Sequence, residues 1–235
     1  MKLKILLSSL FFMSLNAQAN YNFETVTFSL KSAGTSYTWP DGIVYYKINE
    51  NHFNKNQINM IKNAMKEIES ANSNIIFIDV TVGGDSANYI NIHSGSNCSA
   101  RVGYQGNGAQ PLSLNTNGCM DHGTILHELM HALGFNHEQS RSDRDSHVHY
   151  YPQNVQNGEH YNFDKKGGIS LGEYDYDSIM HYGKYSFSSN RNPTLVTING
   201  RAIGVIPEKW TVKYHNFFHT LMVQDNQGQS AHEFD

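Results

Sequence analysis

The chain has 235 residues, of which 39% are hydrophobic, 12% aromatic and 16% charged, and its formal net charge is −4. This composition excludes a disordered or collagen-like protein and supplies enough apolar side chains for one packed domain, or for two lobes sharing a cleft. Because Lys and Arg are dispersed and outnumbered by Asp and Glu, no nucleic-acid partner is expected. Thirteen residues are histidine, an excess that raises the question whether some of them cluster to bind a metal.

The beginning of the chain has the pattern of an export signal. Lys2 and Lys4 precede the apolar run 5–15, and Ala17-Gln18-Ala19 has the small-x-small pattern that a signal peptidase accepts. The alternative is a membrane anchor, but the run is shorter than the roughly 20 residues that a spanning helix needs. We therefore predict that residues 1–19 are a removable signal peptide, without stable membrane insertion. The protein is expected to be secreted, to the extracellular space or, in a Gram-negative bacterium, to the periplasm.

Three short strands and one helix are predicted in the first part of the chain. Residues 43–48, 74–80 and 89–93 are rich in β-branched and aromatic side chains and are bounded by Asn, Gly and Asp, which is typical of strands. Between the first two runs, apolar residues recur every three or four positions and form one face of a helix: Ile58, Ile61, Met65 and Ile68. The order expected for this part is therefore β-α-β-β.

The next segment, 95–118, is rich in Gly, Asn and Ser and predicts a twisted edge strand followed by a loop. Cys98 and Cys119 lie near its two ends, and in an oxidising compartment they can form one disulfide. Two free or zinc-bound thiols are the alternative. A second helix is predicted at 124–133, and after it the periodicity is weak, with only a modest helix expected near 152–160.

The second predicted helix carries a metal-binding pattern. His127 to His137 is HELMHALGFNH, which matches HExxHxxGxxH. At 100° per residue, His127 and His131 fall about 40° apart on one face of a helix, and Gly134 lets the chain turn so that His137 returns as a third ligand. Three imidazoles leave one zinc position open, as in catalytic sites, and Glu128 projects where it can reach a metal-bound water. The pattern predicts one catalytic Zn²⁺ per chain.

Beyond these ligands, the sequence resembles the astacin family of zinc endopeptidases in the metzincin clan. Residues 127–145, HELMHALGFNHEQSRSDRD, are similar to the family's extended signature HExxHxxGFxHExxRxDRD, and residues 178–182, SIMHY, are similar to its Met-turn. The likeness extends from Trp39 to about Ile198. It implies an α+β, metzincin-like, two-lobed catalytic domain over 39–198. The upper lobe would hold a twisted mixed β-sheet and two long helices, and the lower lobe would be largely irregular.

The resemblance also implies roles for single residues. Glu128 would be the general base and then the general acid, and Met180 would form the hydrophobic floor beneath the metal. Tyr182 would ligate the resting metal and then hydrogen-bond the tetrahedral oxyanion. The implied zinc ligands are His127, His131 and His137.

A charged segment follows the third ligand. The resemblance implies that Glu138 is buried and holds the mature amino terminus, since a desolvated carboxylate needs a positive partner. The charged residues after it are expected to form an internal network around Glu138, with a solvated turn as the alternative: Arg141, Asp143, Arg144 and Asp145.

The substrate is expected to lie extended along the edge strand near Cys98 to Tyr104.

The chain departs from the family pattern at both ends. The family usually has a second disulfide at the carboxyl end, but Cys98 and Cys119 are the only cysteines, so packing alone is expected to hold the lower lobe. Residues 199–235 match no pattern and are interpreted as a divergent C-terminal segment. Residues 20–38 are a short N-terminal extension or pro-segment without the family's aspartate switch, for which Glu24 is a poor substitute. Weak zymogen control, with trimming from Asn20 to about Lys31, is expected.

The function predicted from these features is a secreted, monomeric zinc endopeptidase that hydrolyses internal bonds of proteins or peptides. Two alternatives stay open. The first is a non-catalytic, zinc-stabilised module that binds extended peptides, against which Glu128 and Tyr182 argue. The second is a zinc amidase that acts on cell-wall peptides.

Overall fold

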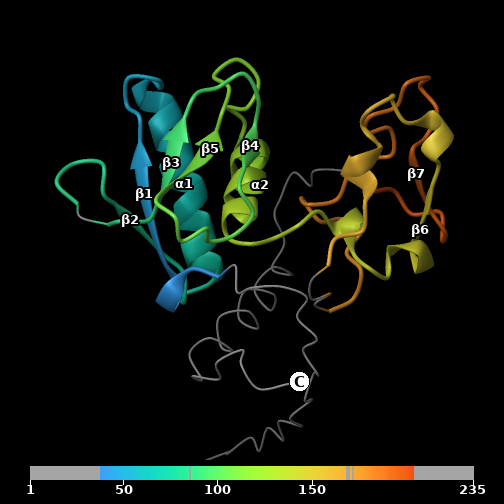
Figure 1. Ribbon diagram of the computed structural model, residues 1–235, viewed down its shortest axis with the longest axis horizontal. Helices are drawn as coiled ribbons and strands as arrows, with labels where there is room; N and C mark the ends of the chain where they lie inside the picture. Colours follow the sequence, from blue (N-terminus) through green and yellow to red (C-terminus); the bar gives the residue numbers. More distant parts are fainter. Residues whose placement is uncertain (1–37, 85, 168–169, 171, 204–235) are drawn as a thin grey trace, which may run out of the picture. The chain divides into compact units, whose positions relative to one another are not determined.

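The structure of the chain is a computed structural model that describes residues 38–84, 86–167, 170 and 172–203. The predicted signal peptide 1–19, most of the extension 20–38 with Glu24, and residues 204–235 of the C-terminal segment lie outside this range. The helices and strands are β1 (Ile43–Ile48), α1 (Lys55–Ala71), β2 (Ile76–Asp79), β3 (Tyr89–His93), β4 (Ser99–Ala100), β5 (Ala109–Ser113), α2 (His122–Ala132), β6 (Val148–Tyr150) and β7 (Leu195–Thr197). Figure 1 shows their course; the fold is of the predicted α+β class.

The first five strands form one mixed sheet in the order β2-β1-β3-β5-β4. All neighbours pair in parallel except β4, which is antiparallel to β5. The predicted β-α-β-β opening is confirmed, and so is an edge strand in 95–118, namely β4. The inner strand β5 was not predicted, because its sequence AQPLS contains Pro111 and few β-formers. Pro111 lies outside the two residue pairs that join β5 to β4.

The two helices begin and end where the sequence supplies caps, and both bury their apolar faces. At the start of α1, the side chains of Asn54 and Gln57 bond reciprocally to each other's backbone N–H groups at 3.0 and 2.9 Å, a capping box. Its predicted apolar face supplies the buried residues Ile61 and Met65. These residues share one core with α2 and with the strands of the sheet, so the two helices of the upper lobe are as expected.

The disulfide prediction is confirmed. Cys98 and Cys119 are bonded, with 5.8 Å between their Cα atoms, and the chain has no free cysteine. The bond connects the residue before β4 to the loop before α2, so that the edge strand is fastened to the helix that carries the histidines. Cys119 is fully buried in the main core. The alternative of free or zinc-bound thiols is therefore wrong.

The described residues after α2 are largely irregular, as predicted, with one small sheet of β6 and β7. The helix expected near 152–160 is wrong: the chain forms 3-10 turns at Pro152–Asn154 and His160–Phe163. Val155 between them makes a bridge to Ser188, and Gly158 has φ +88°, outside the helical region. Buried side chains of the segment after α2 form a second hydrophobic core: Val148, Val155, Phe163, Tyr174, Tyr176, Leu195 and Ile203. In the described part of the chain, no helix is long and apolar enough to cross a membrane.

Candidate active site

Helix α2 carries the first two predicted ligands on the face that lies away from its buried apolar residues. Its N-cap, Asp121, accepts a hydrogen bond from the N–H of Thr124 at 2.9 Å. After the helix ends, Gly134 adopts φ +111°, a conformation that favours glycine, and the backbone turns back. This turn brings His137 to His127 and His131, as the spacing predicted.

The imidazoles of His127 and His131 are oriented by hydrogen bonds at Nδ1. Nδ1 of His127 is 2.8 Å from the carbonyl oxygen of Ile179, and Nδ1 of His131 is 2.7 Å from that of Phe135. Because a carbonyl oxygen only accepts, both Nδ1 atoms carry the proton, and each Nε2 is left with a lone pair. Nε2 of His137 lies 3.2 Å from Nε2 of His127 and 3.2 Å from Nε2 of His131.

This arrangement fits zinc. Zinc binds imidazole nitrogens at about 2.0–2.1 Å in tetrahedral geometry, which places the ligand nitrogens about 3.3 Å apart. A proton on Nε2 of His137 could bond to the lone pair of only one of the other two Nε2 atoms, whereas a bound cation can accept all three nitrogens as ligands. Burial lowers the pKa of His127, of His131 to about 4, and of His137 to about 2. The imidazoles are therefore neutral, as metal binding requires.

Glu128 directly follows the first of the three histidines on α2. Its side chain is buried, and Oε2 finds no hydrogen-bond partner within the described ranges. Burial raises the pKa of this carboxyl to about 7, and a nearby cation would lower it again. A buried carboxylate oxygen without a partner is costly for stability.

The Met-turn packs against the histidines. Met180 is buried in the main core, and its carbonyl oxygen accepts the N–H of Glu138 at 2.9 Å. The ring of Tyr182 lies 4.4 Å from that of His137, centroid to centroid. Burial raises the pKa of the Tyr182 phenol to about 12, so the hydroxyl keeps its proton at neutral pH and can donate a hydrogen bond. The roles predicted for Met180 and Tyr182 stay predictions.

The side chain of Glu138 lies in a hydrogen-bond network. Its Oε1 accepts the N–H of Asp175 at 2.8 Å and Nη1 of Arg141 at 3.1 Å, and burial raises the pKa of its carboxyl. Asp143 joins the same network through Arg141, since its Oδ2 lies 2.8 Å from Nη2 of Arg141. The predicted contact of Glu138 with a mature amino terminus involves residues outside the described range and stays a prediction.

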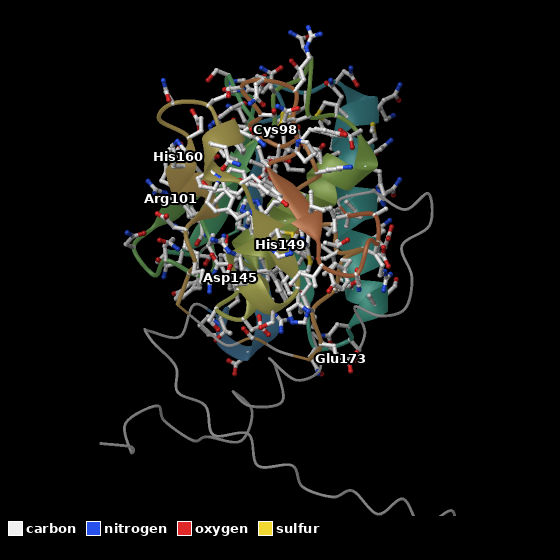
Figure 2. All side chains as sticks on the ribbon, turned by 90° about the vertical axis from the view of Figure 1, so that its right-hand side faces the viewer. Cys98, Arg101, Asp145, His149, His160 and Glu173 are labelled. Atoms are coloured by element: carbon white, nitrogen blue, oxygen red, sulfur yellow. A yellow bond between two sulfur atoms is a disulfide. The ribbon has the colours of Figure 1, made fainter. Side chains whose placement is uncertain are left out.

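The other two charged residues of the segment form a separate group. Arg144 is buried, but Asp145, labelled in Figure 2, has a side chain that is 63% exposed. Asp145 pairs with Arg144 at 3.1 Å and with Lys165 at 2.8 Å. The expectation of one internal network around Glu138 is therefore confirmed for Arg141 and wrong for Asp145, which lies at the surface.

Sequence reasoning missed Gln139, which is fully buried next to the site. Its Oε1 accepts the backbone N–H of Tyr182 at 3.0 Å. No local pattern indicates this contact, because it joins residues 43 positions apart. It also missed the hydrogen bond of 2.7 Å between Tyr174 and His181.

The fold and the three-histidine centre define an α+β domain with a candidate zinc site. The comparisons identify the particular family. The model of the peptidase family described as Astacin matches residues 31–215, more than half of the chain. The protein therefore belongs to the astacin family, whose metalloproteases use zinc.

Individual relatives agree with this assignment. "Astacin-like metalloprotease toxin 1" of Loxosceles intermedia is 45% identical over 157 residues, which cover 65% of this chain and 56% of the toxin. "Blastula protease 10" of Paracentrotus lividus is 41% identical over 71% of this chain and 28% of that protein. The chain thus spans about half, or less, of the length of these two relatives. Among solved structures, the hatching enzyme zinc-protease HCE-1 of Oryzias latipes is similar with a TM-score of 0.71 and 32% identity, over 84% of this chain and 98% of that one.

Proposed function

We propose that the protein is a secreted zinc endopeptidase that hydrolyses internal peptide bonds of proteins or peptides. One observation carries the proposal: a ring nitrogen of each of three histidines converges next to a buried Glu128 whose Oε2 has no partner among the described residues. Three protein ligands leave a position for water or substrate. The disulfide and the export pattern of residues 1–19 support secretion.

The reaction follows from the placement of the side chains. His127, His131 and His137 would hold zinc, which supplies a Lewis acid that polarises the scissile carbonyl and makes a water more acidic. Glu128 takes a proton from the attacking water and then delivers it to the leaving amine. The hydroxyl of Tyr182 donates a hydrogen bond to the carbonyl oxygen as it becomes negatively charged. The ring contact of Tyr182 with His137 and the burial of Glu128 next to His127 on α2 support these roles.

Strand β4 offers a surface for the substrate. Among the described strands it pairs with β5 alone, so its other edge can add a strand by main-chain hydrogen bonds. Just after it, the N–H of Gly103 donates to the carbonyl oxygen of His131 at 2.8 Å. This bond ties the edge to a proposed zinc ligand. A peptide extended along β4 would therefore pass the metal centre.

Removal of the metal tests the proposal. Dialysis against a chelator is expected to abolish cleavage of casein and of an internally quenched peptide, and added Zn²⁺ should restore it. Mg²⁺ is the matched control and should not restore activity, because three imidazole nitrogens suit zinc and not magnesium. Cleavage that persists in the chelated, metal-free protein would contradict the proposal.

The role of Tyr182 is tested by Tyr182→Phe, which removes only the hydroxyl. We expect kcat to fall about 10²- to 10³-fold, the loss typical of one oxyanion donor, with KM and bound zinc nearly unchanged. Tyr185→Phe is the matched control, since the side chain of Tyr185 is 54% exposed, and it should leave kcat unchanged. Equal kcat values in the two variants would remove Tyr182 from the mechanism.

A further inference from the structure

Gln139 is the first residue after Glu138 and is 0% exposed. Its Oε1 accepts the backbone N–H of Tyr182 at 3.0 Å, and its own carbonyl oxygen accepts Nη1 of Arg144 at 3.1 Å. The residue is thus fixed on one side by a buried guanidinium and holds the backbone of the proposed oxyanion donor on the other. Its side chain is not part of the three-histidine cluster.

Other hydrogen bonds hold the Met-turn before Tyr182. The carbonyl oxygens of Ile179 and Met180 accept from Nδ1 of His127 and from the N–H of Glu138, respectively. These bonds fix the floor of the site. At Tyr182 itself, the backbone carbonyl oxygen accepts a hydrogen bond from Nδ1 of His181 at 2.7 Å, and Gln139 supplies the acceptor for the backbone N–H.

An amide side chain at position 139 carries an energetic cost that its contact with Tyr182 offsets. Nε2 of Gln139 is buried and has no hydrogen-bond partner in the part of the chain that the structure describes. A buried N–H group without a partner is unfavourable, and an apolar side chain of the same size would avoid this cost. The Oε1 contact to Tyr182 is the compensating feature, because a misplacement of about 1 Å at an active site can reduce the rate about 100-fold.

We infer that Gln139 is a positioning residue, which orients the Tyr182 hydroxyl toward the reacting carbonyl through the hydrogen bond to the Tyr182 backbone. This inference rests on the proposed function and names a residue that acts within it. Gln139 changes the rate only through Tyr182. The effect of removing it must therefore depend on whether the Tyr182 hydroxyl is present.

A double-mutant cycle of Gln139→Met and Tyr182→Phe tests this dependence. Gln139→Met keeps the volume but removes the acceptor, and should lower kcat about 10-fold with KM and zinc content unchanged. In the Tyr182→Phe background, the same change should lower kcat less than about twofold. Gln139→Glu keeps an oxygen acceptor and should restore most of the rate. If Gln139→Met does not fold, Gln139→Asn, which withdraws the amide by one methylene, replaces it in the cycle.

The outcomes separate this inference from the proposed function. Equal losses in both backgrounds would show that Gln139 only supports the fold, and would overturn the inference. An unchanged kcat in Gln139→Met, combined with a large loss in Tyr182→Phe, would overturn the inference alone. If the wild-type protein loaded with zinc cleaves no peptide, the proposed function fails, and the inference fails with it.

Discussion

Glu128→Gln is expected to lower kcat/KM for an internally quenched peptide about 10²- to 10⁴-fold while leaving one zinc bound per chain. The amide has nearly the shape of the carboxylate, so the packing around α2 is preserved, but it cannot take a proton from water or return one to the amine. Zinc content measured on the purified variant separates this loss of proton transfer from a loss of metal. A variant that contains zinc and retains wild-type kcat/KM would contradict the proposed mechanism.

Glu67→Gln is the matched control for this substitution. Glu67 lies on α1, pairs with His122 at 2.7 Å, and its side chain is 39% exposed. A partly exposed pair of this kind contributes about 0–1 kcal/mol to stability, and it is not part of the metal centre. Glu67→Gln should therefore keep wild-type kcat/KM, so that a difference between the two variants reports on the position of the carboxylate.

The metal centre could be predicted because its residues are close in sequence and follow local rules. His127 and His131 are one helical turn apart, and Gly134 supplies the positive φ at which α2 ends. Periodicity and glycine chemistry are enough to place all three ligands. The first helix was predicted for the same reason, since its apolar positions recur with the helical period.

The structural features that the sequence did not predict depend on contacts between residues that are distant in the sequence. Strand β5 contains Pro111 and has no clear strand propensity, yet its neighbours β3 and β4 make it a strand. In the expected helix near 152–160, the pairing of Val155 with Ser188 overrides the weak local preference. Gln139 contacts Tyr182 only because the backbone folds back after the third histidine. No period in the sequence encodes such a contact.

Because the chain has no second disulfide, buried polar contacts are expected to help stabilise the residues after α2. The side chain of Arg144 makes the principal contacts of this kind. Its guanidinium donates to the carbonyl oxygens of Gln139 and Phe163 and lies over the ring of Tyr150, 5.2 Å from the centroid. The guanidinium therefore connects the segment after the third histidine to the second core. Through Gln139 it also supports the position of Tyr182.

Arg144→Met should consequently lower the free energy of unfolding by about 3–5 kcal/mol. Methionine replaces the aliphatic stem, but it leaves the carbonyl oxygens of Gln139 and Phe163 buried without their donor. The measurement is urea-induced unfolding at constant zinc concentration, followed by tryptophan fluorescence and circular dichroism. Arg101→Met is the control: Arg101, labelled in Figure 2, is exposed, and its replacement should change stability by less than about 0.5 kcal/mol. Equal midpoints for the two variants would show that packing of the second core, and not Arg144, holds this part of the chain.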